Sequence, residues 1–235
     1  MAVKITESNH PLVKNKLSYL VQRDSITHSR DYERLIYEMG LILTCEITKQ
    51  EWGNYKTEWI DEGKHPKHAD WCGGEIVAKE PVVVAVVRAG LTIAQAARDL
   101  LQTPYMAHIG VFEDRNPNGK STTTRPFMVT VPENIKDRKV FIFDLFNVRG
   151  RTAEHVILQL LSYGAQVEDI HYVALIMSPE ARTHVEASKD CDGVHFHCAR
   201  IDTVEDRWLD NVKNTYHRLF RTMDRPDFSL ANDNA

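Results

Sequence analysis

The sequence predicts an α/β protein, with a mostly parallel β-sheet flanked by helices and an irregular β-arm. The clearest observation is the run Val82–Val87, six consecutive apolar residues that suit a strand buried on both faces of a parallel sheet. A second run, Val140–Phe143, is also fully apolar and precedes Asp144. Segments with strand character alternate with helical ones, which is typical of βαβ units and therefore of parallel strands.

The first elements are expected to be helical. Apolar residues recur at helical spacing from Pro11 to Gln22, and a second helix is expected to start near Ser29 or Asp31 and continue past Leu43. Residues 46–80 differ, because they are rich in Gly, Lys, His and Trp and show little apolar periodicity. This composition predicts an arm or an extended hairpin.

The remaining elements follow in alternation. Helices are expected from Leu91 to Leu101 and from Thr152 to Leu161, with Gly164 at a helix C-cap. The polar, turn-rich residues 113–126 indicate a long mobile loop. We expect the other strands at 106–112, 127–131, 170–177 and 194–201. The chain is therefore predicted to be a single domain, 1–235, with 46–80 as the arm and 203–235 as a C-terminal segment.

Composition excludes several classes of function. Lys and Arg total 29 and Asp and Glu total 33, so the net charge is -4, and a dedicated nucleic-acid or anionic-membrane binder would be expected to show a basic excess. No apolar run approaches the ~20 residues that cross a bilayer, and no secretory signal is visible. The four cysteines are too sparse for a disulfide framework. A cytoplasmic protein is the expectation.

Two groups of possible metal ligands occur. His65, His68 and Cys72 lie close together in the sequence, as do His195, His197 and Cys198. Neither group has a second half at a recognisable spacing, so we expect ordinary loop and strand residues and no metal site.

The segment Val140–Thr152 (VFIFDLFNVRGRT) carries the strongest chemical signal. A buried strand ends near Asp144, a short loop contains Gly150, and Thr152 opens a helix whose exposed N–H groups can bind an anion. A carboxylate beside a phosphate pocket suits a sugar phosphate. The equally weighted alternative is a plain strand-to-helix turn with a solvated aspartate and a threonine cap.

This segment resembles the 5-phosphoribosyl 1-pyrophosphate (PRPP) motif of the type I phosphoribosyltransferases. The wider chain is similar to their uracil phosphoribosyltransferase branch, and the resemblance covers roughly the first 200 residues. It begins at His10–Leu17, where the family has HPLVxHKL, and continues through Glu38–Thr48, Val84–Leu91 and Ser178–Glu180 to Asp202. Several weak motifs in one order are more specific than any one of them alone.

The resemblance implies a role for each matching residue. Arg88, Ala89 and Gly90 would hold the pyrophosphate of PRPP, Asp144 would bind ribose hydroxyls, and Arg88 and Asp144 would be the catalytic pair. Substrate contacts are also implied for Asp202 and for the loop residues Val148, Arg149, Gly150, Arg151 and Thr152. The reaction displaces pyrophosphate from the anomeric carbon, with Mg²⁺ accompanying PRPP rather than resting on dedicated protein ligands. The resemblance also implies a homodimer formed through the arm.

Three departures from the family limit what can be transferred. The phosphate loop reads Val-Arg-Gly-Arg-Thr instead of A-T-G-G-S, so Arg151 replaces the second glycine. Glu113 stands where the family has an arginine, and Arg115, Lys120 or Arg125 could replace that arginine. No glycine follows Gly193, so the glycine-rich uracil-recognition segment is missing.

These departures favour one function and leave two alternatives. We expect phosphoribosyl transfer from PRPP to an acceptor other than uracil. The alternatives are a non-catalytic or regulatory homologue that binds a phosphorylated ligand, and a uracil phosphoribosyltransferase that makes UMP with a rebuilt base site.

Overall fold

The computed structural model describes ten stretches of the chain: residues 2–21, 28–51, 57–59, 75–77, 79–103, 105–115, 121–133, 135–203, 208–210 and 212. Most of the expected arm lies outside these ranges, and so does most of the C-terminal segment. His65, His68, Cys72 and Lys120 lie outside them as well.

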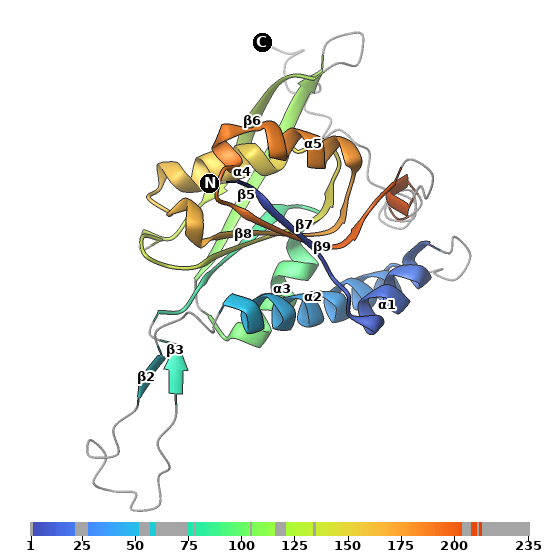
Figure 1. Cartoon of the computed structure of the whole chain (residues 1–235), viewed down its shortest axis with the longest axis horizontal. Helices are drawn as coiled ribbons and strands as arrows, with labels where there is room; N and C mark the ends of the chain where they lie inside the picture. Colours follow the sequence, from blue (N-terminus) through green and yellow to red (C-terminus); the bar gives the residue numbers. More distant parts are fainter. Residues whose placement is uncertain are drawn as a thin grey trace, which may run out of the picture.

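A seven-stranded sheet forms the centre of the molecule (Figure 1), with the strand order β1-β9-β8-β7-β4-β5-β6. Six strands run parallel. Strand β6 lies at one edge of the sheet and pairs antiparallel with its neighbour β5. The strands are β1 (Lys4–Glu7), β4 (Val82–Val87), β5 (Met106–Arg115), β6 (Ser121–Thr130), β7 (Val140–Asn147), β8 (Ile170–Met177) and β9 (His195–Ile201). The predicted α/β class with a mostly parallel sheet is confirmed.

Helices cover both faces of the sheet, which explains the continuous apolar runs in β4, β7 and β8. Helices α1 (Pro11–Val21), α2 (Ser29–Glu51) and α3 (Leu91–Leu101) cover one face, where Leu17, Ile36 and Ile93 belong to one buried cluster. Helices α4 (Arg151–Ser162) and α5 (Pro179–Ala187) cover the other face, where Val156 and Val185 join a second cluster. The core is therefore two apolar layers with the sheet between them.

The predicted boundaries fail at three places. Helix α2 continues to Glu51, so residues 46–51 of the expected arm belong to this helix. The loop expected at 113–126 is wrong in part, because β5 continues to Arg115 and β6 begins at Ser121. The polarity of these residues had indicated a loop, but antiparallel pairing between β5 and β6 stabilises them as strands. Strand β1 and helix α5 were not predicted at all.

The third difference concerns the strand that precedes the candidate phosphate loop. Strand β7 was expected to end at Phe143, but it continues to Asn147 through pairs of Phe146 with Ile176 and of Asn147 with Met177 on β8. Asp144 therefore lies within the strand. The tip of the strand is three residues further along the chain.

Two short strands form a separate antiparallel pair. β2 (Thr57–Trp59) pairs with β3 (Glu75–Val77), and Figure 1 draws them apart from the main sheet. This pairing agrees with the expected hairpin, while the homodimer implied through the arm stays a prediction. Among the described helices, none is both long and apolar enough to cross a membrane.

Candidate functional site

Two neighbouring parallel strands bring the candidate loops to the same edge of the sheet. Strand β4 pairs with β7 from Val82 opposite Val140 to Ala85 opposite Phe143. Both strands then run into loops that lead to helices, α3 after β4 and α4 after β7. Because ligands of parallel α/β sheets bind at the carboxyl ends of the strands, these two loops are the natural walls of a binding site.

The first loop, Arg88–Gly90, is held tightly against the sheet. The Val87–Arg88 peptide bond is cis, and the Gly90 N–H donates to the Val86 carbonyl at 2.8 Å. A Cβ atom at Gly90 would lie 2.1 Å from the carbonyl oxygen of Phe143 on β7, so only glycine allows this approach. The Arg88 side chain is exposed, and no ion pair joins it to another residue in the described part of the chain. The loop therefore presents a cation at the edge of the sheet.

The second loop, Val148–Gly150, is shaped by Asn147 and Gly150. The Gly150 N–H donates to Asn147 Oδ1 at 3.1 Å, which closes a turn at the end of β7. Gly150 has φ of 79°, and a Cβ atom there would lie 2.7 Å from the His184 ring. Within the described ranges, only Gln102 and Asp137 combine positive φ with a side chain, so Arg151 carries no such strain. Of the two glycine positions in the family pattern, the loop has glycine only at Gly150, and its backbone requires glycine there.

The first turn of α4 offers backbone N–H groups to a ligand. Gly150 is the N-cap residue, and it has no side chain that could accept from the N–H groups of Arg151, Thr152 and Ala153. Helix α5 provides a contrast, because Ser178 caps it by accepting from the Ala181 N–H at 3.0 Å. An anion at α4 would replace the missing cap and interact favourably with the helix dipole.

Residues at the start of α5 and within it support this loop: Ser178 belongs to the Ser178–Glu180 motif, whereas His184 belongs to no quoted motif. The Ser178 hydroxyl donates to the Val148 carbonyl, and the Ser178 N–H donates to the Asn147 carbonyl at 2.9 Å. His184 closes the space above Gly150 and lies 2.9 Å from Glu154. The Asn-x-x-Gly spacing is a turn signal that could have identified Asn147 from the sequence. Nothing local in the sequence indicates His184.

Charged groups near the loop are partly neutralised within the chain. Arg149 lies 3.9 Å from Glu180 on α5. Burial raises the pKa of Glu154, but hydrogen bonds from Ser188 and His184, and the charges of His184 and Arg151, outweigh it and leave this pKa below its ordinary value. The half-buried Arg151 therefore stands at the helix start with an ionised carboxylate one turn away.

Asp144 is enclosed, in contrast to the carboxylate expected at the strand tip. Its side chain is 6% exposed, Oδ1 accepts from the Leu145 N–H at 2.7 Å, and Oδ2 accepts from the Tyr172 hydroxyl at 2.8 Å. Burial raises its pKa to about 6, although the hydrogen bonds from Tyr172 and from the Leu145 and Phe146 backbone oppose this rise. The ribose-binding role of Asp144 stays a prediction.

Asp202 organises the start of the C-terminal segment. Its carboxylate accepts from the N–H groups of Trp208 at 3.2 Å and Leu209 at 3.0 Å, which gives this helical stretch an acceptor at its start. Leu209 and Val212 are buried in the cluster formed with α1, α2 and α3, and the Tyr32 hydroxyl donates to the Val212 carbonyl at 3.2 Å. The chain here packs as a helix against the core. Asp202 positions that helix, and its expected substrate contact stays a prediction.

The replacements considered for the family arginine fall in or near the β5–β6 hairpin. Arg125 on β6 places its guanidinium 4.5 Å from the centre of the Phe112 ring. The side chains of Glu113, Asp114 and Arg115 lie outside the described part of the structure.

Comparisons with known proteins relate this chain to the uracil phosphoribosyltransferases. The solved structure of the AQ2163 protein from Aquifex aeolicus superposes with a TM-score of 0.72, at 21% identity and with coverage of 92% of this chain and 97% of that chain. It shares the fold. The chain is 28% identical over 200 residues to a uracil phosphoribosyltransferase of Clostridium beijerinckii, covering 85% of this chain and 88% of that relative. It is 30% identical over 192 residues to one of Clostridium perfringens, covering 80% and 84%.

The sequence model of the uracil phosphoribosyltransferase family matches residues 7–219. The chain therefore belongs to that family, and it is a phosphoribosyltransferase, an enzyme of the glycosyltransferase type.

The backbone requirement at Gly150 can be tested against Gly164. Both glycines have positive φ, but a Cβ atom at Gly164 would meet nothing within 4 Å. We expect Gly164→Ala to lower the free energy of unfolding by about 1 kcal/mol through backbone strain alone. Gly150→Ala should lower it by roughly 1–3 kcal/mol more, because the new methyl group overlaps His184. Equal losses in urea denaturation would contradict the close contact.

The enclosure of Asp144 predicts a pH-dependent loss of stability. Because the folded pKa of about 6 lies above the ordinary value of 3.8, the folded state keeps a proton that the unfolded state has already released. Stability from this group is therefore present at low pH and is lost as the pH rises from about 4 through about 6. Relative to Asp144→Asn, the wild type should lose about 1–3 kcal/mol between pH 4 and pH 7 in denaturation experiments. A difference that does not change with pH would contradict this account.

Proposed function

We propose that this enzyme transfers the 5-phosphoribosyl group of PRPP to a ring nitrogen of an acceptor other than uracil and releases pyrophosphate. The observation that carries the proposal is the pairing of β4 with β7, which sets the Arg88–Gly90 loop beside the N-terminus of α4. Family membership supports the use of PRPP, and the altered C-terminal segment supports a different acceptor.

The two loops suit the two ends of PRPP. Its 5′-phosphate would accept hydrogen bonds from the first-turn N–H groups of α4, with Thr152 and Arg151 adding side-chain contacts. Its pyrophosphate would lie against Arg88 and the backbone of Ala89 and Gly90. Binding both ends fixes the ribose between them, so that the anomeric carbon faces the acceptor in a productive orientation.

Catalysis would come mainly from positioning and electrostatics. As the bond from the anomeric carbon to pyrophosphate breaks, positive charge develops on the ribose and negative charge on the leaving group. Arg88 carries a permanent positive charge, so it would stabilise the departing pyrophosphate more strongly than the bound substrate. The new bond joins the anomeric carbon to the ring nitrogen, and the proton of that nitrogen passes to solvent as pyrophosphate leaves.

Asp144 would contribute through the ribose hydroxyls. Each carboxylate oxygen can accept more than one hydrogen bond, so a hydroxyl could bind while Tyr172 remains in place. Asp144 does not fit as a ligand of Mg²⁺, because it is nearly enclosed and a Mg²⁺ ion with its bound waters needs far more room than one hydroxyl. Mg²⁺ would instead be held by the phosphate oxygens of PRPP.

The C-terminal segment is the reason for proposing a different acceptor. A glycine-rich segment would recognise a base through backbone groups, but here Trp208–Asp210 are helical, and Leu209 and Val212 are buried in the core. Trp208 packs against this core and has the Arg200 guanidinium 5.4 Å from its ring centre. An acceptor would therefore meet side chains where the family pattern offers backbone.

Uracil is the second candidate acceptor. The relatives from Clostridium beijerinckii and Clostridium perfringens are both named uracil phosphoribosyltransferase, and each aligns with at least 80% of this chain. If uracil is the acceptor, its binding groups must come from residues other than a glycine-rich loop.

Product formation from PRPP with a panel of acceptors separates these readings. The panel should contain uracil, other pyrimidines, purines and aromatic ring acceptors, with pyrophosphate release as the readout. We expect turnover with one member of the panel and at least tenfold lower kcat/KM with uracil. Efficient conversion of uracil to UMP would establish the second candidate. Binding of PRPP without turnover on any acceptor would contradict the enzymatic proposal and favour a regulatory role.

Replacement of Arg88 tests the pyrophosphate contact. We expect Arg88→Ala to weaken PRPP binding by about 1–3 kcal/mol in calorimetry, the scale of a charged hydrogen bond. Arg98→Ala is the matched control, because Arg98 is also exposed but lies in the last turn of α3, away from the loop. Equal effects of the two variants would show that only general charge matters.

A further inference from the structure

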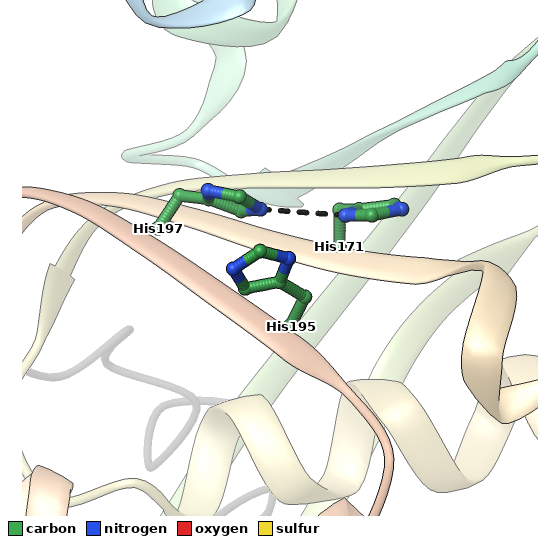
Figure 2. A group of neighbouring side chains, drawn as sticks. All are labelled: His171, His195 and His197. Atoms are coloured by element: carbon green, nitrogen blue, oxygen red, sulfur yellow. Dashed lines mark hydrogen bonds between the residues drawn. The ribbon is translucent and has the colours of Figure 1, made fainter. Parts of the chain in front are cut away.

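Three histidine side chains meet inside the protein at the other end of the sheet. His171 lies at the start of β8, and His195 and His197 lie at the start of β9. His171 pairs with His195 in the strand register, and His197 is two residues further along β9 and therefore on the same face. Their side chains are only 1%, 7% and 5% exposed. Figure 2 shows the three rings close to one another beside the two strands.

The ring nitrogens are close enough to share one ion. One nitrogen from each histidine lies within 4.8 Å of the others. His171 Nδ1 and His197 Nε2 are 3.3 Å apart. Two imidazoles on a tetrahedral zinc ion, each at about 2.0–2.1 Å from the metal, have nitrogens about 3.3 Å apart. The facing pair already has that separation, while the His195 nitrogen, which lies within 4.8 Å of the other two, must move closer to them.

We propose that His171, His195 and His197 bind a divalent transition-metal ion of the zinc type. Imidazole nitrogen is a preferred ligand of Zn²⁺, and a set of three is a complete protein ligand set when a fourth position is left for water or another oxygen. This metal site is separate from the two phosphate loops, and metal binding there does not depend on the assigned reaction.

The surroundings of two of the three rings disfavour their charged forms. Burial, reinforced by Lys139, His195 and Lys4, lowers the pKa of His171 to about 3. Burial, reinforced by the neighbouring histidines and Lys4, holds the pKa of His197 well below its ordinary value. Both rings are therefore neutral at physiological pH, and a metal ion does not have to displace a proton from a cationic imidazole.

One partner of the kind that orients metal-bound imidazoles is already in place. The Thr6 hydroxyl on β1 lies 3.0 Å from Nε2 of His195. Histidines that bind metals commonly donate their other ring N–H to such an oxygen, which fixes the orientation of the ring. Thr6 is therefore assigned as a positioning residue.

A cavity adjoins one of the three rings, that of His197. It has a volume of about 160 Å³, is lined by His197, and is also lined by Thr6, Glu46 and Gln50. This space is large enough for several water molecules, since one water occupies about 30 Å³ in the liquid. Glu46 receives a hydrogen bond from the Ser8 hydroxyl at 2.6 Å and adds negative charge to the cavity wall.

Nearby cations oppose the ion but are partly compensated. Lys139 lies 2.8 Å from Asp169, which offsets its charge. Lys4 is exposed, so solvent screens it. The bound ion would link β8 to β9 at their amino ends. At a rise of roughly 3.3 Å per residue along β8, this position is about 20 Å from the phosphate loops. We therefore expect the ion to stabilise the fold and to have little effect on the transfer reaction.

Metal content of the untagged, full-length protein tests this site directly. The chain should be stripped with a chelator, incubated with ZnCl₂, freed of excess ion and analysed for zinc, with X-ray absorption to identify the ligands. We expect one Zn²⁺ per chain with three imidazole ligands at about 2.0 Å, and a higher Tm than the stripped protein. No retained zinc, or a spectrum showing sulfur ligands, would overturn the proposal.

Two sets of variants assign the ion to these residues. His197→Gln should weaken Co²⁺ or Zn²⁺ affinity about 100-fold or more, and Thr6→Val, which suits a strand, should weaken it about 10–100-fold. The control replaces His65, His68 and Cys72 together, and it should bind as the wild type does. Loss of binding in the control, or unchanged binding in both Thr6→Val and His197→Gln, would overturn the assignment. Because the X-ray absorption measurement uses the wild type, failure of His197→Gln to fold would not prevent the test.

Discussion

The parallel pairing of β4 with β7 is the constraint on which the candidate site depends. Both strands are apolar because helices cover both faces of the sheet, and that burial fixes them as central neighbours. Their carboxyl ends then release two loops at one edge, only one strand spacing apart, about 4.8 Å. The Gly90 position shows how tight this arrangement is, because a single added carbon would overlap the carbonyl oxygen of Phe143. Strand order therefore places side by side the two loops that we propose as the phosphate and pyrophosphate sites.

The structure also explains how the phosphate loop tolerates its altered sequence. A change from glycine to arginine is costly only where the backbone has positive φ or where the side chain has no room. Arg151 is the first residue of α4 and meets neither condition, whereas Gly150 meets both. Asn147 and Ser178 then fix the loop from both sides through the Gly150 N–H and the Val148 carbonyl. Arg151 therefore adds a positive charge at the loop without backbone strain.

The sequence predicted the interior of the sheet well and the edges of the site poorly. Continuous apolar runs identify β4, β7 and β8, because burial on both faces leaves a strong local signal. The end of β7 was misplaced, since its last residues are held by pairing with β8, a partner distant in the sequence. The same pairing explains why Asp144 is enclosed, because Tyr172 reaches it from β8. The histidine cluster was missed for the same reason: His171 is 24 residues before His195, and only strand register brings them together.

The two ends of the sheet thus carry different chemistry. Cationic and N–H-rich loops occupy the carboxyl ends of β4 and β7, while three buried imidazoles gather at the amino ends of β8 and β9. A crystal structure of the protein with PRPP and Mg²⁺ tests the central account most directly. The account predicts density for the 5′-phosphate at the first turn of α4 and for pyrophosphate beside Arg88–Gly90. Arg151 filling the space at the helix start, or PRPP bound away from these two loops, would contradict it.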